Sequence, residues 1–200
     1  MSEILSLAKE YVEFIFESPD WEPFEFHSVK HTRSVFEKAN EWAIACNLDA
    51  MDSLAVKLAA LFHDIGYSSN YKDHEAESIR MFQKFSGSHR VGSDLQEKVI
   101  YLIECTRKTH SDFTDSLACI MHDIDRAAMG MPDFIEQGLN LRKEWEHFIG
   151  LKTNDHEWLE SQVQYLKDTH FKTDYGFDKY NAEKEKNLRA LNALLAQSQG

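Results

Sequence analysis

The chain has 200 residues, of which 42% are hydrophobic and 12% aromatic, a composition that supports a real core and argues against widespread disorder. Its 34 acidic residues outnumber the 22 basic ones, and the formal net charge of -12 would repel phosphate backbones, so we expect no nucleic acid polymer as a partner. The three cysteines are far apart and form no CxxC pair, which argues against a disulfide framework or a thiolate zinc site.

The N-terminal residues Met1 to Ile4 include an early acidic residue and lack the basic segment that opens a signal peptide. No apolar run approaches the roughly 20 residues that a membrane-spanning helix needs. We therefore expect a cytoplasmic protein without a membrane partner.

Helix-period patterns fill the chain between its three prolines and eight glycines, and no strand alternation is evident. This pattern predicts an all-α bundle in a single domain over residues 1–200, with a core at roughly 20–150 and C-terminal helices at 151–200 packed on it. In chain order, helices are expected over residues 2–16, 28–46, 52–64, 73–85, 93–109, 115–129, 132–148, a segment after Asn154, and 181–196.

Several of these helices carry signals at their ends. Gly66 is a plausible C-cap glycine, and Ser93 to Gln96 fits a capping box that would open a helix. Pro132 suits a first helical turn, and Asn154 with Glu157 could cap the next helix. The mixed-charge stretch from Asn181 to Arg189 is expected to be a solvated helix face.

His63 and Asp64 stand side by side in an otherwise apolar stretch, from Ala59 to Tyr67. A buried carboxylate without a partner is costly, so Asp64 needs a cation or several hydrogen-bond donors. A metal ion would meet that need and use His63 as well. The alternative is a partly exposed helix end with Asp64 solvated and His63 packed. A second pair, His122-Asp123, shows that the dipeptide alone proves little.

Two more donor residues favour the metal site over the solvated helix end. His31 lies on the preceding amphipathic helix, and Asp125 lies on a later helix. Three helices could therefore each direct a nitrogen or oxygen donor into one bundle interior, as in known helical metal sites.

The order of His31, His63-Asp64 and Asp125 resembles the HD superfamily of metal-dependent phosphohydrolases. The chain resembles the branch described as predicted metal-dependent HD-superfamily phosphohydrolases. The similarity covers roughly residues 20–150, and a weaker similarity extends over residues 181–188. The stretches that carry it, in order, are residues 27–31, 61–67, 74–78, 102–110 and 123–125.

The resemblance implies that His31, His63, Asp64 and Asp125 are the metal ligands, with Asp123 as the main rival to Asp125 because the family has Asp-x-Asp at this point. Two imidazoles and two carboxylates suit manganese, iron, cobalt, nickel or zinc better than magnesium. The first aspartate of the Asp-x-Asp pair could instead orient a neighbour.

Catalytic roles carried over from the family involve Asp64, Glu75 and Lys108. Glu75 would be a general base or acid, or else a solvated glutamate at a helix N-terminus. Lys108 could neutralise a phosphate, or else cap a helix C-terminus. His74 and His110 could ligate a second metal ion, although His74 could also be a tolerated exchange for asparagine.

His27 stands where the family's aromatic-His-Asn pattern would lead into the first ligand, and its role stays open between a surface histidine and a site residue. The expected function is hydrolysis of a phosphoester in a small molecule, with nucleotides as one candidate class, by metal-activated water. The alternatives are a non-catalytic HD-type ligand-binding or regulatory module and an HD-type oxygenase with two irons. The choice between one and two metals depends on the two extra histidines.

Overall fold

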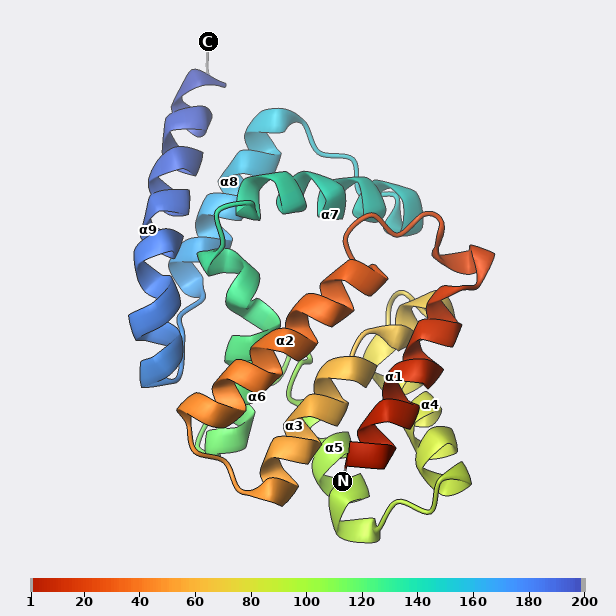
Figure 1. Cartoon of the computed structure of the whole chain (residues 1–200). Coiled ribbons are helices and arrows are strands. Elements are labelled where there is room, and N and C mark those ends of the chain that lie inside the picture. Colours follow the sequence, from red (N-terminus) through yellow and green to blue (C-terminus); the bar gives the residue numbers. More distant parts are fainter. Residues whose placement is uncertain (1, 199–200) are drawn as a thin grey trace. The chain divides into compact units, whose positions relative to one another are not determined.

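The computed structural model describes residues 2–198, and within that range it contains α-helices, short 3-10 helices and no strand (Figure 1). The prediction of an all-α protein is confirmed. The contacts divide the chain into two compact units, one containing residues 27–125 with the segment up to Glu22, the other containing residues 23–26 with the chain from Arg126 onward. In the described part of the chain, no helix is long and apolar enough to cross a membrane.

The first unit is built around one central helix, α3, which packs against α1, α2, α4 and α5. Every residue of α3 from Leu54 to Phe62 is buried except Lys57. A helix that is apolar on nearly all sides belongs in the middle of a bundle, which explains this position. The elements of this unit are α1 (Ser2–Phe16), η1 (Pro19–Trp21), α2 (Val29–Ala45), α3 (Ala50–Phe62), η2 (Ile65–Ser68), α4 (His74–Ser88), α5 (Ser93–Glu104) and α6 (Ser116–Arg126), whose last residue belongs to the second unit.

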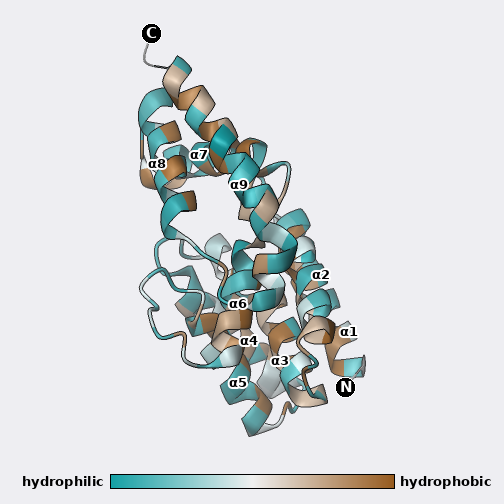
Figure 2. Cartoon of the chain, turned by 90° about the vertical axis from the view of Figure 1, so that its left-hand side faces the viewer, coloured by the Kyte–Doolittle hydropathy of each residue, from teal (hydrophilic) through white to brown (hydrophobic). Residues whose placement is uncertain are grey.

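The second unit contains η3 (Ala127–Gly130), α7 (Phe134–Ile149), α8 (Asp155–Asp168) and α9 (Asp174–Gln197). Helix α9 packs against α8, α7 and η3, and hydrophilic and hydrophobic residues alternate along it (Figure 2). Asn187 donates hydrogen bonds of 3.0 and 2.8 Å to the carbonyl oxygens of Met129 and Met131, and Lys184 is buried one turn earlier. The prediction of a fully solvated face is therefore wrong at these two positions.

Gly66 does not end α3, as the sequence suggested, but lies inside η2. His63 occupies the C-cap position of α3, with ordinary helical dihedral angles. A Cβ atom on Gly66 would lie 2.1 Å from the carbonyl oxygen of His74 and 2.6 Å from the amide nitrogen of Ser78. The glycine is needed because η2 approaches the backbone of α4 too closely for any side chain.

Two predicted signals at helix starts are wrong, although α5 does begin at Ser93 as predicted. Helix α5 has Gly92 at its N-cap without a side-chain cap, and the hydroxyl of Ser93 bonds the carboxylate of Asp94 instead of closing a capping box. Helix α7 starts at Phe134, so Pro132 lies in the preceding turn.

Other helix ends show how side chains set boundaries. Helix α5 ends at Glu104 rather than near 109, because the amide and the hydroxyl of Thr106 both donate to the carbonyl of Ile103, at 3.1 and 2.7 Å. Helix α9 begins at Asp174, earlier than expected, with the side chain of Thr173 accepting from the amide of Gly176. The capping box of Asn154 and Glu157 is confirmed.

Candidate metal centre

The four predicted ligands come from three helices of the first unit. His31 lies in the first turn of α2, where the N-cap Ser28 accepts a hydrogen bond from the His31 amide. His63 and Asp64 follow the last residue of α3, and Asp125 lies at the end of α6. Positions far apart in the sequence therefore meet because α2 packs against α3, and α6 brings Asp125 to the same place.

The ligand atoms of His31, His63 and Asp125 all lie within 4.8 Å of one another. Asp64 joins them through one carboxylate oxygen, Oδ2, which lies 3.3 Å from Nε2 of His31 and 3.0 Å from Nε2 of His63. Oδ1 of Asp125 lies 3.4 Å from the same His63 nitrogen. The structure thus brings all four side chains together, with two nitrogen donors facing two carboxylates.

One nitrogen of His63 is held by the backbone, and the other faces the cluster. Nδ1 lies 3.1 Å from the carbonyl oxygen of Ala60, which can only accept, so Nδ1 carries the hydrogen. In the neutral ring, Nε2 then has a free lone pair. This nitrogen is buried and lies 3.0 Å from Oδ2 of Asp64 and 3.4 Å from Oδ1 of Asp125. A buried lone pair directed at two carboxylates fits a bound cation, because a metal ligated by histidine is normally oriented through its other ring nitrogen in this way.

The electrostatics of the cluster also favour a positive charge. Burial lowers the pKa of His63, but the carboxylates of Asp64 and Asp125 outweigh it and raise the pKa to about 10. Burial likewise opposes the charge on Asp64, yet His63 and His31 hold the pKa of that carboxyl well below its usual range. In the protein without a metal ion, a proton on His63 therefore balances the negative charge of the two carboxylates. A divalent cation could replace this proton.

The turn that carries His63 and Asp64 is tied to α4 by a single buried side chain. The hydroxyl of Ser78 donates to the carbonyl oxygen of His63 at 2.7 Å and accepts from the amide of Gly66 at 2.9 Å. This bridge, together with the close approach at Gly66, fixes the backbone on both sides of Asp64.

The start of α4 adds a second group of side chains beside Asp64. Nε2 of His74 lies 3.6 Å from Oδ1 of Asp64 and 3.5 Å from Oε1 of Glu75. The ring of Tyr67 stacks on His74, with centroids 3.7 Å apart, and on His27, with centroids 4.0 Å apart. His27 is thus a buried residue next to the site rather than a surface histidine.

Protonation in this group differs from that at His63. Burial lowers the pKa of His74 to about 4, so its ring is neutral at pH 7 and able to bind a metal. Burial raises the pKa of Glu75, while Arg107 works in the opposite direction. Burial, followed by the charges of Asp64 and other neighbours, raises the pKa of Tyr67 well above its usual value.

Three other candidates have different surroundings. Asp123 is fully buried, and its Oδ1 lies 3.0 Å from Nδ1 of His122. His110 contacts the carbonyl oxygen of Asp112 and the ring of Phe113, and Lys108 is exposed.

Arg107 was not among the residues predicted for the site. Its guanidinium group reaches Glu75, whereas the predicted residue was its neighbour Lys108. The neighbouring motif residues Thr106 to His110 pointed to a basic group here, but adjacent basic residues could not be told apart without the local turn.

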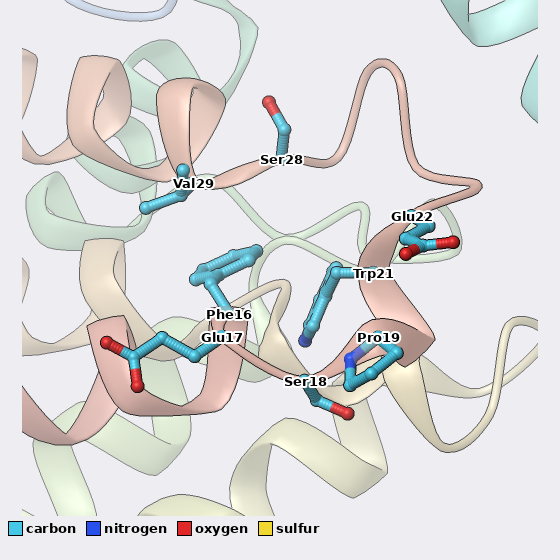
Figure 3. A pocket seen from close by; sticks show the side chains of 8 residues that line it. All are labelled: Phe16, Glu17, Ser18, Pro19, Trp21, Glu22, Ser28 and Val29. Atoms are coloured by element: carbon cyan, nitrogen blue, oxygen red, sulfur yellow. The ribbon is translucent and has the colours of Figure 1, made fainter.

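A pocket of about 370 Å³ opens at the N-terminal end of α2 (Figure 3). Phe16 and Trp21 form its aromatic part, with ring centroids 4.2 Å apart. The predicted ligands and catalytic residues do not line it; its lining residues are Phe16, Glu17, Ser18, Pro19, Trp21, Glu22, Ser28 and Val29.

Comparison with known proteins gives one match. The family model described as HD domain matches residues 29–130, slightly more than half of the chain, and this range includes all four predicted ligands. No curated protein and no solved structure matches the chain. HD domains bind divalent metal ions, and the superfamily consists mostly of metal-dependent hydrolases. The resemblance to the HD superfamily is confirmed, and the chain belongs to the HD domain family.

Proposed function

We propose that this protein is a metal-dependent phosphohydrolase of small phosphorylated molecules, with His31, His63, Asp64 and Asp125 as ligands of one divalent cation. The observation that carries the proposal is the cluster itself: the ligand atoms of His31, His63 and Asp125 lie within 4.8 Å of one another, and Oδ2 of Asp64 lies 3.0 Å from the buried Nε2 of His63. The mixed nitrogen and oxygen donors favour manganese, iron, cobalt, nickel or zinc over magnesium.

When bound, such a cation lowers the pKa of water from about 15.7 towards 7 and offsets charge on phosphoryl oxygens. The chain's own residues have separate tasks. The Ala60 carbonyl and Ser78 hold His63 and the turn around Asp64 in one orientation. Glu75, buried beside His74, would accept the proton of the attacking water.

Lys108 is exposed near the end of α5 and would attract an anionic substrate toward the site. The net charge of -12 makes a local positive charge useful, because the overall field of the chain repels phosphates.

Metal analysis of the purified protein together with a phosphoester panel tests the proposal. We expect about one manganese, iron, cobalt, nickel or zinc ion per chain and phosphate release that is lost on chelation and restored by manganese or cobalt. A metal-loaded protein that binds a phosphorylated ligand tightly without turnover would instead indicate a regulatory module.

A two-metal centre is a second candidate because Asp64 faces two groups of donors. Its Oδ2 approaches His31 and His63, whereas its Oδ1 lies 3.6 Å from Nε2 of His74. If these donors hold two irons, the protein could be an oxygenase. Two irons per chain and oxygen consumption in the absence of phosphate release would support this candidate over hydrolysis.

A further inference from the structure

Arg107 lies among three carboxylates at the edge of the site. Its Nη1 is 2.7 Å from Oδ1 of Asp73 and 3.4 Å from Oε2 of Glu75, and its Nε donates to Glu104. Asp73 and Glu75 flank the first residue of α4, and Arg107 lies in the turn after α5. One guanidinium group therefore joins the ends of two helices that pack against each other.

The three carboxylates differ in their access to water. The side chains of Asp73 and Glu104 are 53% and 45% exposed, so water can solvate their charges. The side chain of Glu75 is only 10% exposed. A buried carboxylate needs a charged or hydrogen-bonding partner far more than an exposed one does. Of the three contacts, the one with Glu75 has the largest structural consequence.

We propose that Arg107 is a positioning residue for Glu75: it is anchored on Asp73 and Glu104, and it holds the Glu75 carboxylate beside the metal centre. This inference rests on the proposed function, in which Glu75 takes a proton from water. The other Glu75 oxygen, Oε1, lies 3.5 Å from Nε2 of His74, so the carboxylate lies between the guanidinium group and the His74 ring.

An arginine suits this task better than a lysine. Its planar fork offers several donors in fixed directions, and Arg107 uses Nε for one partner and Nη1 for two others. An ammonium group would keep the charge but would not reach all three carboxylates in the same geometry. A lysine at this position should therefore preserve only part of the effect.

The alternative is that Arg107 is a surface ion pair that contributes little. Exposed pairs are usually worth at most about 1 kcal/mol. Arg80 provides a matched control, because it pairs with Glu77 three residues away on α4, as Arg107 pairs with Glu104. The Arg80 side chain is 67% exposed.

The test compares R107Q, R107K and R80Q in the metal-loaded full chain. We expect R107Q to lower kcat about 100-fold, the effect of a misplaced catalytic group, while KM changes less than about threefold and the metal content stays the same. R107K should recover part of the lost kcat, and R80Q should behave like the wild type. A kcat of R107Q equal to that of R80Q would overturn the inference. A decrease in kcat that is fully explained by a lower metal content of R107Q would also overturn it.

A double variant separates this role from a general effect on the site. In the E75Q background, R107Q should reduce kcat no further, because the group that Arg107 positions is already gone. A reduction by the same factor in both backgrounds would overturn the inference. A wild type that holds metal but hydrolyses no phosphoester would contradict the proposed function. In that case the coupling between Arg107 and Glu75 is tested by melting temperature, measured for the wild type, E75Q, R107Q and the double variant. If the two single-variant shifts simply add up in the double variant, the inference is overturned.

Discussion

The chain contains the sequence His-Asp-Ile twice, at residues 63–65 and at 122–124, in two different environments. The first copy begins where α3 ends, and its side chains meet donors from α2, α4 and α6. The second copy lies within α6, and its histidine and aspartate contact each other. The dipeptide is the same, so the neighbouring helices make the difference.

The two pairs differ in which ring nitrogen faces the neighbouring aspartate. In the second pair, Nδ1 of His122 faces the carboxylate of Asp123. In the first pair, Nδ1 of His63 is directed to the backbone instead, and its other nitrogen is left to the cluster. Each aspartate has the histidine of its own pair 3.0 Å away, but His63 presents Nε2, which also faces Asp125, whereas His122 presents Nδ1.

Removing the aspartate from each pair should give the largest difference between the two sites. We expect D64A to lose its metal and to lower hydrolysis by about 1,000-fold or more, because a bound metal supplies several kcal/mol to the transition state. D123A should keep its metal and lose about 1–3 kcal/mol of unfolding free energy, the usual cost of an unmade buried hydrogen bond. Metal analysis, activity and denaturant unfolding measure these effects. Full metal content and activity in D64A would refute the ligand assignment.

The residue after each His-Asp-Ile also differs, glycine at 66 and aspartate at 125. We expect G66A to lose about 1–3 kcal/mol of stability, because its Cβ would lie 2.1 Å from the His74 carbonyl oxygen and force the backbone apart. Activity should also fall, since the shift displaces His74 and Glu75.

G87A is the control in the same unit, because a Cβ there meets no atom within 4 Å. Its stability should stay the same or rise by up to about 1 kcal/mol, since alanine favours a helix. If denaturant unfolding shows equal stabilities for G66A and G87A, the close contact between η2 and α4 does not constrain the turn.

The protonation of His63 gives a third test. Its pKa of about 10 in the metal-free protein means that the ring is protonated at pH 8, whereas a metal ligand must be neutral. Loading the metal at pH 8 should therefore release about one proton, and the apparent affinity should fall up to about tenfold for each unit that the pH is lowered below 10. Calorimetry in buffers of different ionisation enthalpy measures the release. Binding without proton release would contradict a protonated His63 as the group whose proton the metal ion replaces.

The smallest effect is expected at Lys108, because this side chain is exposed to solvent. K108Q should raise KM about two- to threefold at low ionic strength, and this difference should disappear in high salt, where surface charges are screened. An unchanged KM at low ionic strength would remove Lys108 from substrate recognition.

The choice between Asp123 and Asp125 shows where sequence reasoning reaches its limit. Two residues along an α-helix correspond to a rotation of about 200°, so the two carboxylates point in nearly opposite directions. The Asp-x-Asp pattern predicts that one of them faces the site, and the family resemblance favoured Asp125. In the structure, Asp125 faces His63, whereas Asp123 contacts His122.

Local chemistry in the sequence was sufficient to predict the all-α fold, most helix positions and a cluster of histidine and aspartate side chains that could hold a metal ion, because apolar periodicity and residue identity act over short distances. Only the packing of the helices decided that Gly66 serves a close backbone contact, that Arg107 rather than Lys108 reaches Glu75, and that His31 meets Asp64. These outcomes depend on which helix faces turn toward one another, and that is set by burial of the whole core rather than by any one segment.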